Sequence, residues 1–264
     1  MMVTYVNAIC MNWFWLADDR CLQYGIYGVY RMEPTRTTIA GIPALIYGAP
    51  SDKAFLYVHG RYSKKEEAES FARVVTPKGY RVVSFDLPEH GERAGEAYPC
   101  TVQNGVHDLS AVYDAVTGVY RSLSLYACSL GAYFSLTACG GGAFARCLFV
   151  SPILDMERLI RNMMLWSNVT EERLREEKRI ETSFGETLSW EYYDFVRNHP
   201  ITRWDSPTSI LYGENDNLTE RNVLDAFVRK FHCKVTVMKD GEHYFHTPEQ
   251  LSFLQDWIEG QEYE

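Results

Sequence analysis

Short apolar runs alternate along most of the chain with longer segments in which apolar residues recur at helical spacing. The runs expected as strands lie at residues 42–47, 54–58, 81–85, 123–127, 145–150, 208–212 and 234–238. Continuous apolar runs are typical of strands that are covered on both faces. The segments expected as helices lie at residues 64–77, 106–120, 130–138, 219–231 and 248–258. This alternation predicts an α/β fold with a mostly parallel, doubly wound sheet.

Two segments depart from the alternation. Residues 1–50 are interpreted as an N-terminal β region of short pieces and turns, one of them at residues 24–31. Residues 153–205 show no strand pattern and include a charged run at residues 171–179, which is typical of a solvated helix face. We therefore expect a core of residues 1–152 and 206–264. We expect residues 153–205 to form a helical cap over the carboxyl edge of the sheet, where ligands bind in such folds.

The composition limits the classes of partner. The 264 residues are 46% hydrophobic, which suits one globular core with a modest insertion. The chain carries 26 Lys and Arg against 35 Asp and Glu, and its net charge is −9 with no basic run. This charge argues against binding to nucleic acid or to an anionic membrane surface. No apolar stretch is long enough to span a membrane. The sequence leaves the oligomeric state open.

The cysteines indicate a reducing compartment. There are seven of them, an odd number, and no two have C-x-x-C spacing. Reduced thiols fit this pattern better than a disulfide framework or a zinc site. The N-terminal segment lacks a basic leader and a small-residue cleavage site. We expect a cytoplasmic protein without a cofactor or a metal.

The segment at residues 123–134 holds a candidate nucleophile. An apolar run leads into Ala127-Cys128-Ser129-Leu130-Gly131, and a helical pattern follows. A serine at a sharp strand-to-helix turn between small residues is exposed for nucleophilic attack. The alternatives are that Ser129 is an ordinary helix cap or that Cys128 is the nucleophile. The spacing of the glycine centres the turn on Ser129.

A serine hydroxyl needs a base to take its proton, and the base needs an acid to orient it. Asp216 follows the strand expected at residues 208–212, and His243 follows the strand at residues 234–238. A parallel sheet would gather both at the edge where Ser129 lies. Glu214 is the alternative acid. His246 forms an H-x-x-H pair with His243, but no carboxylate motif accompanies it, and we expect no metal site.

A glycine after the strand at residues 54–58 supports the same chemistry. His59-Gly60-Arg61 would let the Arg61 N–H turn toward the nucleophile. In the tetrahedral intermediate of acyl transfer, the backbone N–H groups of Arg61 and Leu130 would form an oxyanion hole.

Five motifs occur in order along the chain. They are His59-Gly60, Asp86-Leu87-Pro88-Glu89-His90-Gly91, Ala127-Cys128-Ser129-Leu130-Gly131, Gly213-Glu214-Asn215-Asp216 and Gly241-Glu242-His243. Over roughly residues 40–260 the chain resembles the α/β-hydrolases, in particular the capped esterase, lipase and serine-aminopeptidase-like group. The resemblance implies Ser129 as nucleophile, His243 as base and Asp216 as acid. Ala127 and Glu89 stand where the motifs G-x-S-x-G and D-x-P-G-H-G have glycine.

These observations predict a serine hydrolase that cleaves a small-molecule carboxylic ester through an acyl-enzyme intermediate. An amide or thioester hydrolase is the alternative within enzymes, and a non-catalytic binding protein of the same fold is the alternative outside them. The candidate substrate-pocket residues are Met163, Met164, Trp166, Trp190 and His246. Packing inside the cap explains the apolar members of this set equally well.

Overall fold

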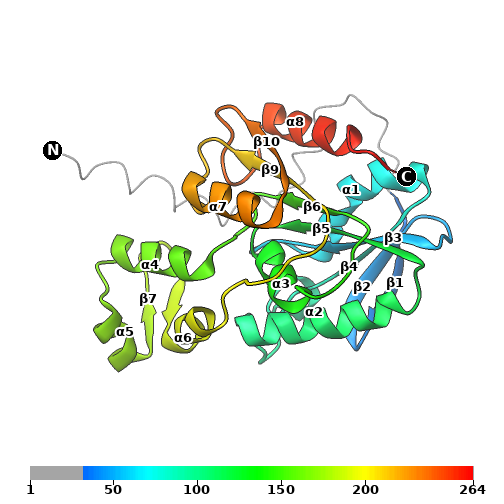
Figure 1. Cartoon of the computed structure of the whole chain (residues 1–264). Helices are drawn as coiled ribbons and strands as arrows, with labels where there is room; N and C mark the ends of the chain where they lie inside the picture. The colour runs from blue at the N-terminus through cyan, green and yellow to red at the C-terminus, as the bar shows by residue number, and fades with distance from the viewer. Residues whose placement is uncertain (1–31, 264) are drawn as a thin grey trace.

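A computed structural model describes residues 32–263, so the β piece expected at residues 24–31 lies outside the described residues (Figure 1). Within residues 32–263, eight strands form one sheet in the order β1-β2-β4-β3-β5-β6-β9-β10. The strands are β1 (Thr35–Ile39), β2 (Ile42–Tyr47), β3 (Lys53–Val58), β4 (Arg81–Phe85), β5 (Ser122–Cys128), β6 (Cys147–Val150), β9 (Thr208–Gly213) and β10 (Lys234–Met238). The strands from β4 to β10 in this order pair in parallel, whereas β1 with β2 and β2 with β4 pair antiparallel. The predicted mostly parallel sheet is confirmed.

Helices cover both faces of the sheet. They are α1 (Ala68–Val75), α2 (Val102–Thr117), α3 (Leu130–Ala138), α7 (Arg221–Phe231) and α8 (Pro248–Glu259). Neighbouring residues of a strand point to opposite faces, so Phe55 of β3 packs in one apolar cluster with Phe71 of α1, and Leu56 in another with Leu109 of α2. The first cluster also receives α8, and the second receives α3 and α7. Across residues 32–263, no helix combines the length and apolar character needed to cross a membrane.

Helix α2 begins four residues before the start expected from its periodicity. Its N-cap is Thr101, whose Oγ1 accepts a hydrogen bond from the Asn104 amide at 3.2 Å. Gly105 of α2 lies where α2 crosses α3. A Cβ atom there would be 2.3 Å from the ring of Phe134. The glycine is therefore needed for helix packing and does not end the helix.

The elements between β6 and β9 lie together beside the sheet (Figure 1). They are α4 (Met156–Trp166), α5 (Glu171–Glu177), β7 (Arg179–Glu181), β8 (Thr187–Ser189) and α6 (Trp190–Asn198). We call residues 153–205 the insertion. We expected no strands in the insertion, and this expectation was wrong, because β7 and β8 form an antiparallel hairpin. Its strands are too short for a visible pattern, and only the paired Ile180 and Leu188 are buried in them.

Candidate active site

Ser129 lies at the turn from β5 into α3, in a backbone conformation that non-glycine residues rarely adopt. Its φ is 48° and its ψ is −115°; such strained positions cost roughly 1–3 kcal/mol and persist where packing holds them. The packing is visible at Gly131, where a Cβ atom would lie 2.4 Å from the carbonyl oxygen of His59. The start of α3 thus rests directly on the end of β3. Ala127, in the place of the usual glycine, is fully buried and accommodated.

A chain of hydrogen bonds joins Ser129, His243 and Asp216. Ser129 Oγ is 2.9 Å from His243 Nε2, and His243 Nδ1 is 2.8 Å from Asp216 Oδ2. The other carboxylate oxygen of Asp216 accepts from the amides of Leu218 and Thr219 at 2.9 and 2.8 Å. The Asp216 side chain is fully buried and that of His243 is 11% exposed. With Nδ1–H donating to Asp216, Nε2 is left to accept the proton of the serine hydroxyl.

The rival residues have other contacts. Glu214 is exposed, and its carboxylate accepts from the Asp240 amide at 3.1 Å, which supports the turn. Burial raises the pKa of the Cys128 thiol to about 12, so this sulfur is protonated and poorly nucleophilic near neutral pH. His246 is exposed, stacks on the Tyr244 ring and lies 3.3 Å from Glu242. Within the described range, no three His, Cys, Asp or Glu side chains come together as metal ligands.

The loop at residues 59–63, here called the Gly60 loop, passes beside the nucleophile. A Cβ atom at Gly60 would lie 3.4 Å from the Cβ atom of Ser129. His59 Nδ1 donates to the Gly60 carbonyl at 2.8 Å. This carbonyl and the Arg61 N–H belong to one trans peptide and point in opposite directions, so the bond also sets the direction of the Arg61 N–H. The Leu130 amide is in the first turn of α3, where amides have no acceptor within the helix.

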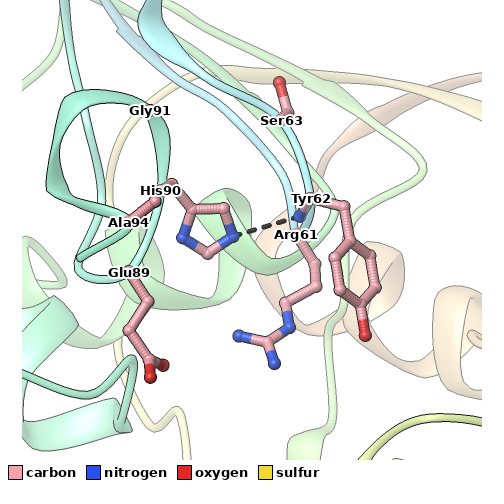
Figure 2. Close-up of a pocket in the computed structure, with 7 residues that line it drawn as sticks. All are labelled: Arg61, Tyr62, Ser63, Glu89, His90, Gly91 and Ala94. Atoms are coloured by element: carbon pink, nitrogen blue, oxygen red, sulfur yellow. Dashed lines mark hydrogen bonds between the residues drawn. The ribbon is translucent and has the colours of Figure 1, made fainter. Parts of the chain in front are cut away.

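His59 and His90 act as braces. His59 Nε2 accepts from the Leu87 amide at 3.1 Å, and His90 Nε2 accepts from the Tyr62 amide at 3.0 Å (Figure 2). His90 Nδ1 donates to the Pro88 carbonyl at 2.7 Å. Burial lowers the pKa of His59 to about 4 and also lowers the pKa of His90. Neutral imidazoles can both donate and accept, as these contacts require.

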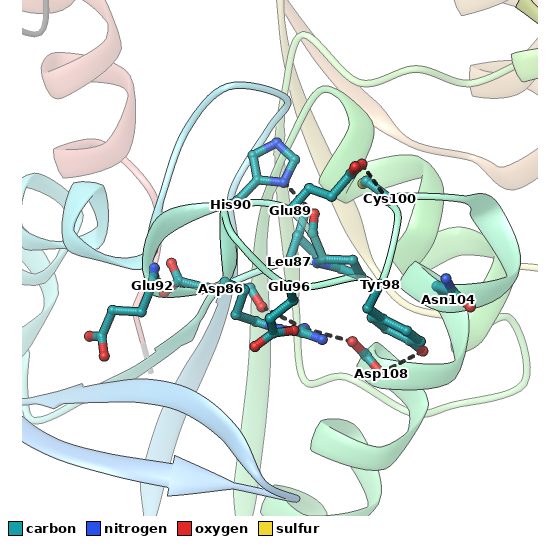
Figure 3. Close-up of polar contacts among 12 residues, drawn as sticks. Asp86, Leu87, Glu89, His90, Glu92, Glu96, Tyr98, Cys100, Asn104 and Asp108 are labelled. Carbon is teal, nitrogen blue, oxygen red and sulfur yellow. Dashed lines mark hydrogen bonds and ion pairs between the residues drawn. The ribbon is translucent and has the colours of Figure 1, made fainter. Parts of the chain in front are cut away.

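The six residues from Asp86 to Gly91, here called the Asp86 loop, are anchored by a buried ion pair. Figure 3 shows Asp86, Glu89 and His90 of this loop, with the contact from Glu89 to Cys100. Asp86 Oδ2 lies 2.6 Å from Lys65 Nζ and accepts from the Glu92 amide at 3.0 Å. Glu89, in the place of a motif glycine, has a φ of 62°. Its carboxylate accepts from the Cys100 amide at 2.6 Å. The loop therefore has a left-handed conformation at residue 89 although this residue is not a glycine. Asp86 has a structural role, because its carboxylate anchors the loop.

Comparison with known proteins bears on the fold. No protein-family model matches the chain, and a search of the curated proteins finds no match. Solved structures do match. Est1E from Butyrivibrio proteoclasticus, solved with ferulic acid, is 16% identical with a TM-score of 0.70 and covers 85% of this chain and 96% of its own. Alpha/beta hydrolase domain-containing protein 10 from mouse is 13% identical with a TM-score of 0.68, and the match covers 86% of this chain and 96% of the mouse protein. The chain has the α/β-hydrolase fold. A thioesterase domain from the curacin biosynthetic pathway shares this fold at 18% identity and a TM-score of 0.56. The match covers 86% of this chain and 98% of the thioesterase domain.

On this α/β-hydrolase framework, the predicted pocket residues do not surround one cavity. Met164 is buried in the apolar core, and Met163 packs against that core. Trp166 is half exposed at the end of α4. Trp190 lines a cavity of about 320 Å³ between α6 and the start of α2, without the other four. Their contact with substrate stays a prediction.

A larger cavity of about 380 Å³ adjoins the Gly60 loop. It is lined by Arg61, Tyr62, Ser63, Glu89, His90, Gly91 and Ala94 (Figure 2). Close by, the insertion reaches the same loop through Glu186, whose carboxylate contacts the side chains of Arg61 and Tyr62. The sequence pattern did not point to Glu186, because it lies in the turn between the short strands β7 and β8.

Proposed function

We propose that the protein is a serine hydrolase that cleaves a small-molecule carboxylic ester through an acyl-enzyme intermediate. The observation that supports this most directly is the continuous hydrogen-bond chain from Ser129 through His243 to Asp216. All three residues follow the carboxyl ends of parallel strands, where α/β sheets bind ligands. The esterases among the solved structures of this fold agree with it.

In the proposed mechanism, His243 Nε2 takes the proton of Ser129 as Oγ attacks the ester carbonyl carbon. The C–O bond to the alcohol breaks after His243 returns this proton to the leaving oxygen. Water then attacks the acyl-enzyme with the same help and releases the carboxylic acid. The amides of Arg61 and Leu130 stabilise the oxyanion in both steps, and such donors are each worth about 10²–10³-fold in rate.

We also propose that the insertion serves as a cap that shapes the acyl or alcohol subsite. Its contact with the Gly60 loop through Glu186 supports this proposal, because that loop passes beside Ser129. A thioester is the second candidate substrate, because the curacin thioesterase domain has this fold and the acyl-enzyme chemistry is the same. A panel of p-nitrophenyl esters, acyl thioesters and aminoacyl amides would rank the three bonds by kcat/KM.

The Ser129→Ala variant tests the proposal. We expect it to lower p-nitrophenyl ester hydrolysis by about 10⁴-fold or more, because the hydroxyl is the attacking atom. The matched control is Cys128→Ala, which removes the neighbouring nucleophile. It should keep both turnover and labelling by a fluorophosphonate probe. Undiminished activity in folded Ser129→Ala would overturn the assignment of Ser129 as the nucleophile. No labelling of Ser129 in the wild type would favour a binding protein.

A further inference from the structure

The contact between Glu186 and the Gly60 loop joins two parts of the chain that are far apart in sequence. Arg61 Nε donates to Glu186 Oε1 at 3.4 Å, and its terminal nitrogen donates to Oε2 at 3.3 Å. The hydroxyl of Tyr62 donates to the same carboxylate. Two consecutive side chains of the loop thus end on one carboxylate of the insertion. The Arg61 and Glu186 side chains are 34% and 26% exposed, so water reaches the pair but does not surround it.

The peptide between these contacts is the one proposed to hold the oxyanion. On its N-terminal side, His59 Nδ1 holds the Gly60 carbonyl. On its C-terminal side, His90 Nε2 holds the Tyr62 amide. These two bonds fix the loop from the core. Rotation of the segment around the Arg61 Cα atom would move the Arg61 and Tyr62 side chains, and Glu186 of the insertion restrains both of them.

We propose that Glu186 is a positioning residue for the oxyanion hole. By holding the Arg61 and Tyr62 side chains, it keeps the Arg61 N–H directed at the tetrahedral intermediate. This inference rests on the proposed function, because it concerns the same Ser129 chemistry. It assigns the insertion a part in transition-state stabilisation in addition to shaping a subsite.

The proposal predicts that loss of Glu186 changes kcat and leaves KM nearly unchanged. An oxyanion hole is complementary to the tetrahedral oxygen more than to the planar ester carbonyl, so its loosening lowers kcat while KM changes little. A substrate-contacting residue would instead change KM with acyl chain length. The Arg61 hydrogen bonds to Glu186 are long and the pair is partly exposed, so we expect the Glu186 variants to lose less activity than the removal of a whole oxyanion-hole donor, which costs about 10²–10³-fold.

The experiment measures kcat and KM for p-nitrophenyl acetate and butyrate in Glu186→Ala and Glu186→Gln, together with inhibition by phenylboronic acid. The boronic acid adds to Ser129 as a tetrahedral anion and reports on the oxyanion hole without turnover. For Glu186→Ala we expect kcat to fall about tenfold, KM to change less than about twofold and the boronic acid to bind about tenfold more weakly. Glu186→Gln keeps an acceptor oxygen and should retain more activity than Glu186→Ala.

The matched control is Glu181→Gln, which removes one exposed negative charge from the same hairpin. It should behave as the wild type. Arg61→Met should reproduce the loss of Glu186→Ala, and the double variant should add little to either, because both remove one interaction. Thermal unfolding and near-ultraviolet circular dichroism check that the insertion stays folded. If Glu186→Ala unfolds it, Glu186→Gln provides the same comparison.

Two negative outcomes are distinct. If the wild type turns over esters and Ser129 is labelled by a fluorophosphonate, but kcat and boronic acid affinity do not change in the Glu186 variants, this inference is wrong and the proposed function stands. A rise of KM alone in the Glu186 variants would likewise contradict this inference and leave the proposed function standing. If the wild type neither turns over esters nor is labelled, the proposed function itself is wrong.

Discussion

At the scale of single residues, strained backbone positions border the candidate active site, and Ser129 and Glu89 are two of them. Ser129 and Glu89 have φ values of 48° and 62°. The first is the turn that presents the hydroxyl to His243. The second keeps the shape of the Asp86 loop. This loop contains His90, which accepts a hydrogen bond from the Tyr62 amide. Strain at such positions persists only where surrounding contacts hold it, and Glu89 has such a contact in the Cys100 amide.

Glu89 offers a clean test of this strain. Glu89→Gly and Glu89→Ala both lose the hydrogen bond to the Cys100 amide, but only glycine adopts positive φ without a penalty from Cβ. We expect Glu89→Gly to be more stable than Glu89→Ala by about 1 kcal/mol in urea unfolding. Equal stabilities would show that residue 89 does not hold this conformation in solution.

At the scale of elements, the insertion is organised around one buried ring. Tyr193 of α6 is fully buried, and its hydroxyl donates to Glu171 of α5 at 3.1 Å. The guanidinium groups of Arg161 and Arg197 lie 5.5 and 5.3 Å from the ring centre. One side chain therefore links α4, α5 and α6, and the hairpin that carries Glu186 follows from α5.

Tyr193→Ala tests the unity of the insertion. Removing a buried aromatic side chain costs about 3–5 kcal/mol, and much of this loss should fall on the insertion. We expect early proteolytic cleavage within residues 153–205, together with lower stability in urea. Tyr193→Phe loses only the hydroxyl and should cost about 1 kcal/mol. Resistance of Tyr193→Ala to cleavage would contradict a role of the ring in holding the insertion.

At the scale of the whole molecule, the carboxyl edge of the sheet gathers residues from four distant parts of the chain. His59 follows β3, Ser129 follows β5, Asp216 follows β9 and His243 follows β10. His59 has a further part, because it joins the end of β3 to Leu87 beyond β4. It is fully buried as the neutral imidazole, so the stability of the fold depends on its protonation.

This dependence has a definite sign. Burial lowers the pKa of His59 from 6.5 to about 4, so between these values the unfolded chain binds a proton that the folded chain does not. The contribution of His59 to stability is complete above pH 7 and is lost as the pH falls toward 4. We expect a loss of about 2 kcal/mol between pH 7.5 and 5, read from urea unfolding. His59→Gln should flatten this dependence, whereas His107→Gln, which alters an exposed side chain, should preserve it. The same slope in both variants would contradict the assignment.

Much of this arrangement was determined by the sequence alone. The bounds of β2, β4, β10 and α3 were predicted to the residue, because each has a continuous apolar or helical pattern between clear turn residues. The order of Ser129, Asp216 and His243 at strand ends predicted that they would lie together, since parallel strands bring their carboxyl ends to one edge. Periodicity erred at the start of α2, which lies four residues earlier than predicted because Thr101 caps the helix there.

Other features were decided only by the tertiary structure. Asp216 and Glu214 lie in the same turn after β9, so the sequence does not show which of them meets His243. The geometry of the turn directs the Asp216 carboxylate toward His243 and that of Glu214 away from it. The hairpin of β7 and β8 depends on burying two side chains against the rest of the insertion. Glu186 meets Arg61 across 125 positions of the chain. Such contacts depend on how distant elements pack, and no local pattern of apolar and polar residues records that.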